Sequence, residues 1–126
     1  MQIRVYYEDT DAGGIVYHSN YLNFCERARS EFFFSKGKLP IIDNCHFVVR
    51  KMECDFLRSA QFGDIVDVDT KIVEFKRSSF TLFHEIKKEN AILFTATVLL
   101  VLVDNGKPKR LTKQIQNTLK ELFHHY

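Results

Sequence analysis

The chain opens with side chains that alternate between apolar and polar. The period is two from Ile3 to Glu8, which predicts a first strand that ends near Asp9. The pair Gly13 and Gly14 then breaks the pattern. We therefore expect a short strand followed by a loop.

A helical period follows this loop. Residues 19–36 place apolar side chains three and four positions apart, which is the spacing of one helix face: Tyr21, Phe24, Cys25, Ala28 and Phe32. Ser19 can cap such a helix and Gly37 can end it. The pattern predicts one long helix packed through this face.

A period of two returns in the second half of the chain. Residues 52–56, 66–72 and 80–86 each alternate as half-buried strands do, and residues 91–103 are apolar on both faces, as in a covered central strand. Short polar links between them predict four strands in hairpin succession. After Thr112, a last apolar stripe predicts a short helix: Leu111, Ile115, Leu119 and Leu122.

This order of elements defines the fold class. One strand, a long helix, four strands and a closing helix predict an α+β fold, in which a five-stranded antiparallel sheet surrounds the long helix. Because residues 91–103 are apolar on both faces, the second sheet face needs cover as well. We expect a second copy of the chain to supply it.

Length and composition narrow the class of protein. At 126 residues the chain is one domain, residues 1–126, and a net charge of +2 is too small for a dedicated nucleic-acid binder. Three cysteines are an odd number, which favours a reducing compartment, and the N-terminus lacks the pattern of a signal peptide. The apolar run at 91–103 is shorter than the roughly 18 residues that span a bilayer.

The loop before the long helix concentrates acids, paired glycines, tyrosines and His18. Acidic residues near a helix start have an ordinary explanation, because negative charge is favourable there. The functional interpretation is that the glycines let backbone approach a ligand, free N–H groups receive an anionic oxygen, and Asp11 is the nearby base or nucleophile. Both interpretations stand on the local chemistry alone.

The same segment carries a family resemblance. Asp11, Gly14, Val16, His18, Asn20 and Tyr21, continuing into Glu26–Arg27–Ala28–Arg29, resemble the hotdog-fold acyl-CoA thioesterases, in the YbgC-like branch of the 4-hydroxybenzoyl-CoA thioesterase family. Residues 47–52, which read FVVRKM, are a second match. Residues 57–60 depart from the aromatic-then-proline pattern of the family.

The resemblance implies a hotdog fold and hydrolysis of an acyl-CoA to a carboxylic acid and coenzyme A. It implies that Asp11 is catalytic and that His18 assists it, with contacts to substrate from Gly14, Val16, Asn20 and Tyr21. Tyr7 would share strand parity with Asp11 if the chain stayed extended, which would make its hydroxyl a third catalytic group. A thioester suits a carboxylate, because its thiol leaves without a strong general acid. Asp11 could activate water or attack the carbonyl itself.

Coenzyme A brings phosphates that need cations. Lys76, Arg77 and Ser79 form a candidate clamp in a predicted turn, although a solvated turn would have the same composition. Arg50 is a further candidate, as are Arg58 and the basic cluster at 107–110. No metal-ligand spacing is present, and no cofactor is expected beyond coenzyme A as part of the substrate.

Two other functions remain open. One is a hotdog dehydratase of 3-hydroxyacyl thioesters, although the sequence has no His-Phe-Pro segment. The other is a non-catalytic acyl-thioester-binding subunit, which the branch's association with the Tol-Pal envelope system would suit. We expect a cytoplasmic homodimer with sites at the subunit boundary, and the resemblance also implies that two dimers pair into a tetramer.

Overall fold

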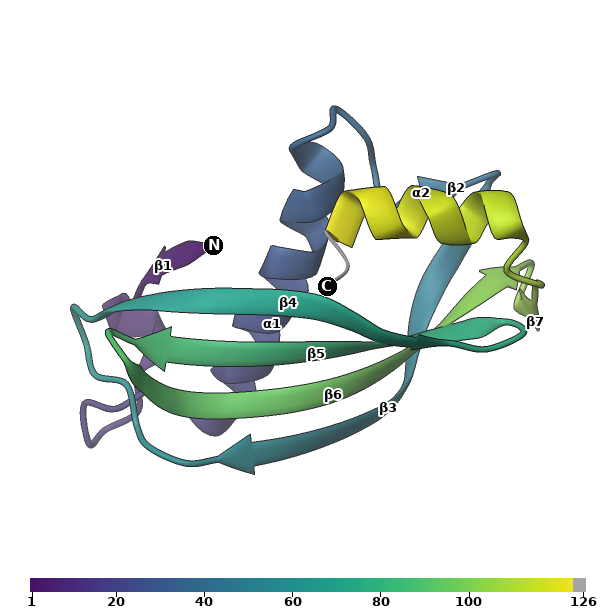
Figure 1. Ribbon diagram of the computed structural model, residues 1–126. Helices are drawn as coiled ribbons and strands as arrows, with labels where there is room; N and C mark the ends of the chain where they lie inside the picture. Colours follow the sequence, from purple (N-terminus) through teal and green to yellow (C-terminus); the bar gives the residue numbers. More distant parts are fainter. Residues whose placement is uncertain (124–126) are drawn as a thin grey trace.

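One long helix lies against one antiparallel sheet in the computed structural model (Figure 1), which describes residues 1–123. The sheet is built from β1 (Gln2–Arg4), β3 (Cys45–Phe56), β4 (Ile65–Phe75), β5 (Ser79–Lys88) and β6 (Ala91–Asp104), and the helix is α1 (His18–Phe34). A second helix, α2 (Lys113–Phe123), closes the chain. The predicted α+β class, the five main strands and both helices are confirmed, while residues 124–126 of the predicted domain lie outside the described part.

The strand order differs from a succession of hairpins. The sheet runs β1-β4-β5-β6-β3-β2, with β2 (Ile41–Ile42) and β7 (Lys107–Pro108) as two additional two-residue strands. β4, β5 and β6 pair in sequence order, but β3 pairs with β6, with Phe47 opposite Leu102 and Phe56 opposite Phe94. The prediction that β3 pairs with β4 is therefore wrong, because β1 takes the free edge of β4.

The N-terminal prediction also needs correction. β1 ends at Arg4, and Tyr7–Asp9 form one turn of 3-10 helix instead of a continued strand. The turn is held by Asp9, which is 5 % exposed and whose Oδ2 accepts the Tyr6 N–H at 2.8 Å. Tyr7 is therefore not in an extended segment that leads to Asp11.

The long helix buries the predicted face. Tyr21, Phe24, Cys25 and Ala28 are buried as expected, Phe32 is half-buried, and Phe33 is buried although the pattern did not include it. The helix begins at His18 with Tyr17 in the cap position, and no side chain caps it, so the prediction that Ser19 is the cap is wrong. Gly37 follows the helix with φ of 69°, the conformation of a helix stop.

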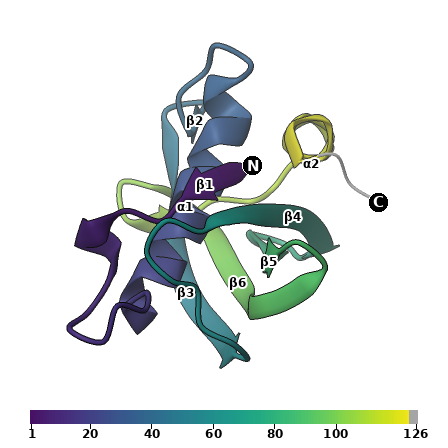
Figure 2. The ribbon, with the colours of Figure 1, turned by 90° about the vertical axis from the view of Figure 1, so that its left-hand side faces the viewer.

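The short helix α2 closes one end of the core. Figure 2 shows α2 nearly end-on, above β4. Its apolar stripe is buried, as predicted, and Phe123 brings its ring to within 4.9 Å of the Phe32 ring and 6.2 Å of the Phe80 ring, between centroids. Aromatic contacts therefore join both helices to the sheet.

The connection from β3 to β4 crosses the start of α1. Within it, the Ala60 N–H donates to the hydroxyl of Tyr21 at 2.9 Å, and the Ala60 carbonyl accepts the Val16 N–H at 2.9 Å. The Tyr21 ring stacks on Phe94 with centroids 5.2 Å apart. This connection fixes the loop before the helix onto the sheet.

A polar contact lies under the middle of α1. Arg29 approaches Nε2 of His84 at 3.2 Å, and Thr70 Oγ1 lies 2.8 Å from Nδ1 of the same ring. His84 is fully buried, and burial together with the Arg29 charge lowers its pKa to about 3. The imidazole is therefore neutral. Because a guanidinium only donates, Nε2 accepts and Nδ1–H donates to Thr70.

We expect His84 to make the fold sensitive to acid. In the unfolded chain the histidine binds a proton near pH 6.5, whereas in the folded chain it does so only near pH 3, so stability is full above pH 6.5 and falls as the pH drops towards 3. At pH 5 the loss from this group is about 2 kcal/mol. His84→Gln keeps an acceptor and a donor without the titration, so urea unfolding at pH 7.5 and 5 should show a smaller drop for this variant. His46→Gln, on the exposed face of β3, should keep the parent's drop. Equal drops for His84→Gln and the parent would contradict a neutral buried His84.

Tyr21→Phe should lower the free energy of unfolding by about 1–3 kcal/mol, because it leaves the buried Ala60 N–H without its acceptor while the ring stack remains. Tyr7→Phe is the matched control, since Tyr7 is 78 % exposed. Chemical unfolding of both variants measures the difference. A Tyr21→Phe protein as stable as the Tyr7→Phe protein would show that this hydrogen bond does not hold the crossing connection.

Candidate functional site

Asp11 sits in a tight loop just before α1. Its Oδ1 accepts the Gly13 N–H at 2.8 Å, and its backbone carbonyl accepts the Gly14 N–H at 3.0 Å. A Cβ on Gly13 would lie 3.2 Å from this Oδ1, and Gly14 has φ of 80°, so both glycines fit the loop's geometry. The carboxylate is exposed, and no described residue donates a hydrogen bond to its other oxygen. The loop therefore orients an ionisable oxygen toward solvent.

His18 is the first residue of α1 and is exposed. Its ring lies 4.2 Å from the Tyr17 ring and meets the edge of Phe56 at 6.3 Å, between centroids. These two aromatic contacts hold the imidazole between the loop and the end of β3.

Asp11 and His18 line one cavity of about 310 Å³. The structure brings four of the predicted site residues to this cavity, namely Asp11, Val16, His18 and Tyr21. The walls also include Arg58 and five residues that the sequence patterns did not assign to the site: Ile15, Tyr17, Phe56, Leu57 and Ser59. Arg58 was one of the candidate cations, and its position beside Asp11 could have been found only by knowing where the 57–64 connection runs.

Other predicted residues support the cavity from outside. The Asn20 side-chain amide donates to the Asp9 carbonyl at 2.9 Å, and Gly14 shapes the turn. Tyr7 points its ring at Phe62, 5.9 Å away between centroids, and does not line the cavity. The Asn20 amide therefore binds the backbone of the loop. Tyr7 is not in the extended geometry that would bring its hydroxyl to Asp11, so the geometric basis for a catalytic Tyr7 is wrong.

The predicted phosphate clamp lies at the opposite end of the sheet. In Figure 1 the loop before α1 lies at the left and the turn between β4 and β5 at the right. Lys76 and Arg77 in this turn line a separate cavity of about 580 Å³ with Arg110. Ser79 is half-buried at the start of β5, and Arg50 is exposed at the register shift of β3. Within a single chain these residues do not meet Asp11.

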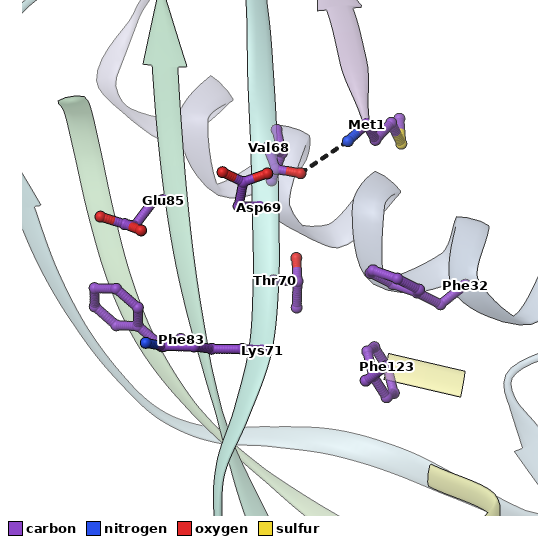
Figure 3. Close-up of a pocket in the computed structure, with 9 residues that line it drawn as sticks. All are labelled: Met1, Phe32, Val68, Asp69, Thr70, Lys71, Phe83, Glu85 and Phe123. Carbon is purple, nitrogen blue, oxygen red and sulfur yellow. Dashed lines mark hydrogen bonds between the residues drawn. The ribbon is translucent and has the colours of Figure 1, made fainter. Parts of the chain in front are cut away.

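A further cavity, of about 380 Å³, opens on the β4 edge (Figure 3). Phe32 and Phe123 face it from the two helices, and Thr70, which binds His84, lies between them and the outer residues of the sheet. Two of its charged groups are occupied: Asp69 pairs with Lys87 at 3.2 Å, and Lys71 lies over the Phe83 ring. None of the predicted catalytic residues reaches it.

The cysteines and the possible metal ligands do not form a reactive centre in the described chain. Cys25, Cys45 and Cys54 are free thiols, and burial raises the pKa of Cys25 to about 12. Among residues 1–123, no three His, Cys, Asp or Glu side chains gather as a metal site would require. No helix in this part of the chain combines the length and apolar character needed to cross a bilayer.

Comparisons with known proteins identify the family of the chain. The family model described as "Thioesterase superfamily" matches residues 13–94. The Helicobacter pylori protein (strain 26695) named "Acyl-CoA thioesterase YbgC" is 49 % identical over 86 residues, a match that spans 68 % of this chain and only 65 % of that protein.

Two further comparisons extend over nearly the whole chain. The Escherichia coli O6:H1 protein named "Acyl-CoA thioester hydrolase YbgC" is 40 % identical over 126 residues, covering 94 % of this chain and 93 % of that protein. A crystal structure of a Thermus thermophilus thioesterase complexed with coenzyme A and Zn superposes with a TM-score of 0.84 at 27 % identity, covering 100 % of this chain and 95 % of that one. The chain belongs to the thioesterase superfamily and has its hotdog fold.

Proposed function

We propose that this chain hydrolyses acyl-CoA thioesters to a carboxylic acid and free coenzyme A. The observation that carries the proposal is the placement of Asp11 and His18 on the wall of one cavity at the start of α1. The names of the Helicobacter and Escherichia relatives support the same reaction.

The site supplies what thioester hydrolysis requires. The Asp11 carboxylate keeps one oxygen free of hydrogen bonds from described residues, so it can deprotonate a water molecule or attack the thioester carbonyl. In the first turn of α1 the Asn20 N–H donates to the Tyr17 carbonyl, whereas the N–H groups of His18 and Ser19 have no backbone acceptor among the described residues. These two N–H groups can bind the oxyanion that forms on the carbonyl. The thiolate of coenzyme A then leaves without a strong acid, and His18 orients the water or the acyl group. Coenzyme A belongs to the substrate, and the proposed reaction uses no separate cofactor.

The walls of the cavity favour an apolar acyl group. Ile15, Tyr17, Phe56 and Leu57 surround the space beside Asp11 and His18. Phe56 and Leu57 are more than half exposed in the single chain, so a bound acyl group would bury them. Arg58, on the same wall, is placed to meet an anionic part of the substrate.

We also propose that the chain acts as a homodimer joined through β3. Outside the two-residue contact with β2, residues 47–56 have no strand on one side within the described chain. Such an open edge is a template for strand pairing, and a two-fold axis pairs it with the same edge of a second copy. The outer face of β6 supports a second copy less strongly than the open edge of β3 does. This face is not wholly apolar, because it carries Thr95 and Thr97 as well as Leu99.

This dimer would complete the site. Phe56, at one end of β3, contacts His18, while the other end of β3 lies near the β4–β5 turn, since Val101 of β6 pairs with both Val48 and Ser79. Antiparallel pairing of two β3 strands sets opposite ends side by side. The partner's Lys76 and Arg77 would then approach Asp11, where they can bind coenzyme A phosphates. Pairing of two dimers into a tetramer is the assembly that the family resemblance favours.

The competing functions are less well supported. A dehydratase would need a catalytic histidine with a helix-borne acid, whereas here the acid is on the loop. A scaffold role beside the Tol-Pal system is supported only by the resemblance, and such a binder would return its acyl-CoA intact. We place the protein in the cytoplasm, consistent with three free thiols.

Asp11→Asn should lower kcat by about a hundredfold or more, because it removes the charge that both mechanisms need. His18→Ala should lower kcat by roughly tenfold, since the imidazole only supports water or substrate. Steady-state hydrolysis of a panel of acyl-CoA esters, followed by released thiol, measures both effects. Glu8→Gln, on the neighbouring 3-10 turn, is the control and should hydrolyse normally. Near-normal kcat in Asp11→Asn with an unchanged melting temperature would exclude this mechanism.

The double variant Lys76→Ala/Arg77→Ala should raise KM several-fold with little change in kcat, because contacts to the phosphates persist through the reaction. The control is the double variant Lys36→Ala/Lys38→Ala, which removes two exposed lysines after α1 and should keep the parent's KM. Light scattering on the same samples should show a dimer or a larger even assembly. A stable monomer, or an unchanged KM in the first variant, would contradict the composite site.

A further inference from the structure

A second cavity adjoins α1 farther along the helix. It has a volume of about 370 Å³ and lies between α1, β3 and α2. Its polar wall consists of Glu26, Arg29, Ser30 and His46, and the remaining wall is apolar, with Phe33 and Phe47 among its residues. It shares no lining residue with the Asp11 cavity. The two are therefore separate sites on one helix.

Arg29 is the unusual residue of this cavity. It is only 9 % exposed, and no carboxylate of the described chain lies within ion-pair distance of it. Its one hydrogen bond goes to the neutral imidazole of His84, although a guanidinium has five N–H donors. No nitrogen of the Arg29 side chain is both sealed from solvent and without a partner. Because Arg29 lines this cavity, the cavity is the space in which a ligand can meet its remaining donors.

A buried fixed charge without a counter-charge is costly and is usually paired. Glu26 lies one turn before Arg29 on the same wall, but it is exposed and forms no ion pair with it. Burial lowers the pKa of Arg29 by more than the neighbouring Cys25 and Glu26 raise it. The charge of Arg29 is therefore only partly balanced within the chain.

We propose that this cavity binds a carboxylate that carries an apolar tail. The guanidinium offers a planar pair of donors that matches a carboxylate, and the aromatic wall matches a hydrocarbon or aryl tail. The proposal rests on the proposed function for the source of the ligand, because acyl-CoA hydrolysis releases carboxylic acids of this kind. The site is distinct from the place where the acid forms. His84, held from its other side by Thr70, fixes the direction of the guanidinium.

The first test compares two ligands with the same tail. Calorimetric titration of octanoate and of 1-octanol into the intact, assembled protein should show octanoate binding at least tenfold more tightly, because only the carboxylate pairs with Arg29. Equal affinities for octanoate and octanol would overturn the proposal. Absence of octanoate binding up to millimolar concentration would also overturn it, and would indicate that a second copy of the chain fills the space beside β3.

Variants on the cavity wall give opposite expectations. Arg29→Gln should weaken octanoate binding by about tenfold, whereas Glu26→Gln should strengthen it about threefold by removing a competing charge. Because loss of Arg29 could unfold the chain, Ser30→Leu provides an independent test, since it fills the cavity from a half-buried position and should abolish binding. An unchanged octanoate affinity in both Glu26→Gln and Ser30→Leu would refute the site. Binding does not require turnover, so octanoate binding by a preparation that fails to hydrolyse acyl-CoA would overturn the proposed function and leave this site standing.

Discussion

The pairing of β3 with β6, on the far side of the sheet from β4, is the constraint on which the rest of the structure depends. Because β1 takes the free edge of β4, the chain cannot return from β3 by a tight turn and must cross the start of α1. The crossing connection contributes Leu57, Arg58 and Ser59 to the Asp11 cavity, and its Ala60 anchors Tyr21. The same pairing leaves the outer edge of β3 open. The pairing of β3 with β6 thus places the crossing connection on a wall of the site and leaves a strand edge for a second subunit.

Asp9 and Asp11, which precede α1, differ in burial and therefore in role. Asp9 is 5 % exposed, accepts the Tyr6 N–H, and provides its carbonyl to Tyr17 and Asn20. The Asp11 side chain is exposed, and one oxygen of its carboxylate accepts the Gly13 N–H. Asp9 therefore stabilises the loop, whereas Asp11 keeps an oxygen free for a substrate. Arg29 presents a related case in the core, because its charge is buried against an uncharged imidazole.

Local periodicity was sufficient to predict the four long strands and both helices, but not the 3-10 turn at Tyr7–Asp9. The alternation in β4 and β5 and the helical spacing of Tyr21, Phe24 and Ala28 each reflect packing against one face, which the sequence records directly. Strand order was not predictable from the same signal, because alternation shows which face of a strand is buried but not which strand pairs with it. The clustering of Asp11 with His18 was predictable, since both border one helix start. Arg29, His84 and Thr70 come from three elements and meet only in the folded chain, so no spacing could indicate their contact.

Subunit complementation tests the composite site most directly. Asp11→Asn chains and Lys76→Ala/Arg77→Ala chains are each impaired as homodimers, but a mixed dimer contains one site with an intact Asp11 and the partner's intact Lys76 and Arg77. The account predicts that co-refolding the two variants in equal amounts restores at least a quarter of the parent's kcat/KM per site, because random pairing of equal subunits leaves a quarter of all sites intact. Steady-state acyl-CoA hydrolysis by the mixture, with the KM resolved, is the measurement. A kcat/KM no greater than the average of the two separate variants would show that each site is built within a single chain and would contradict the account.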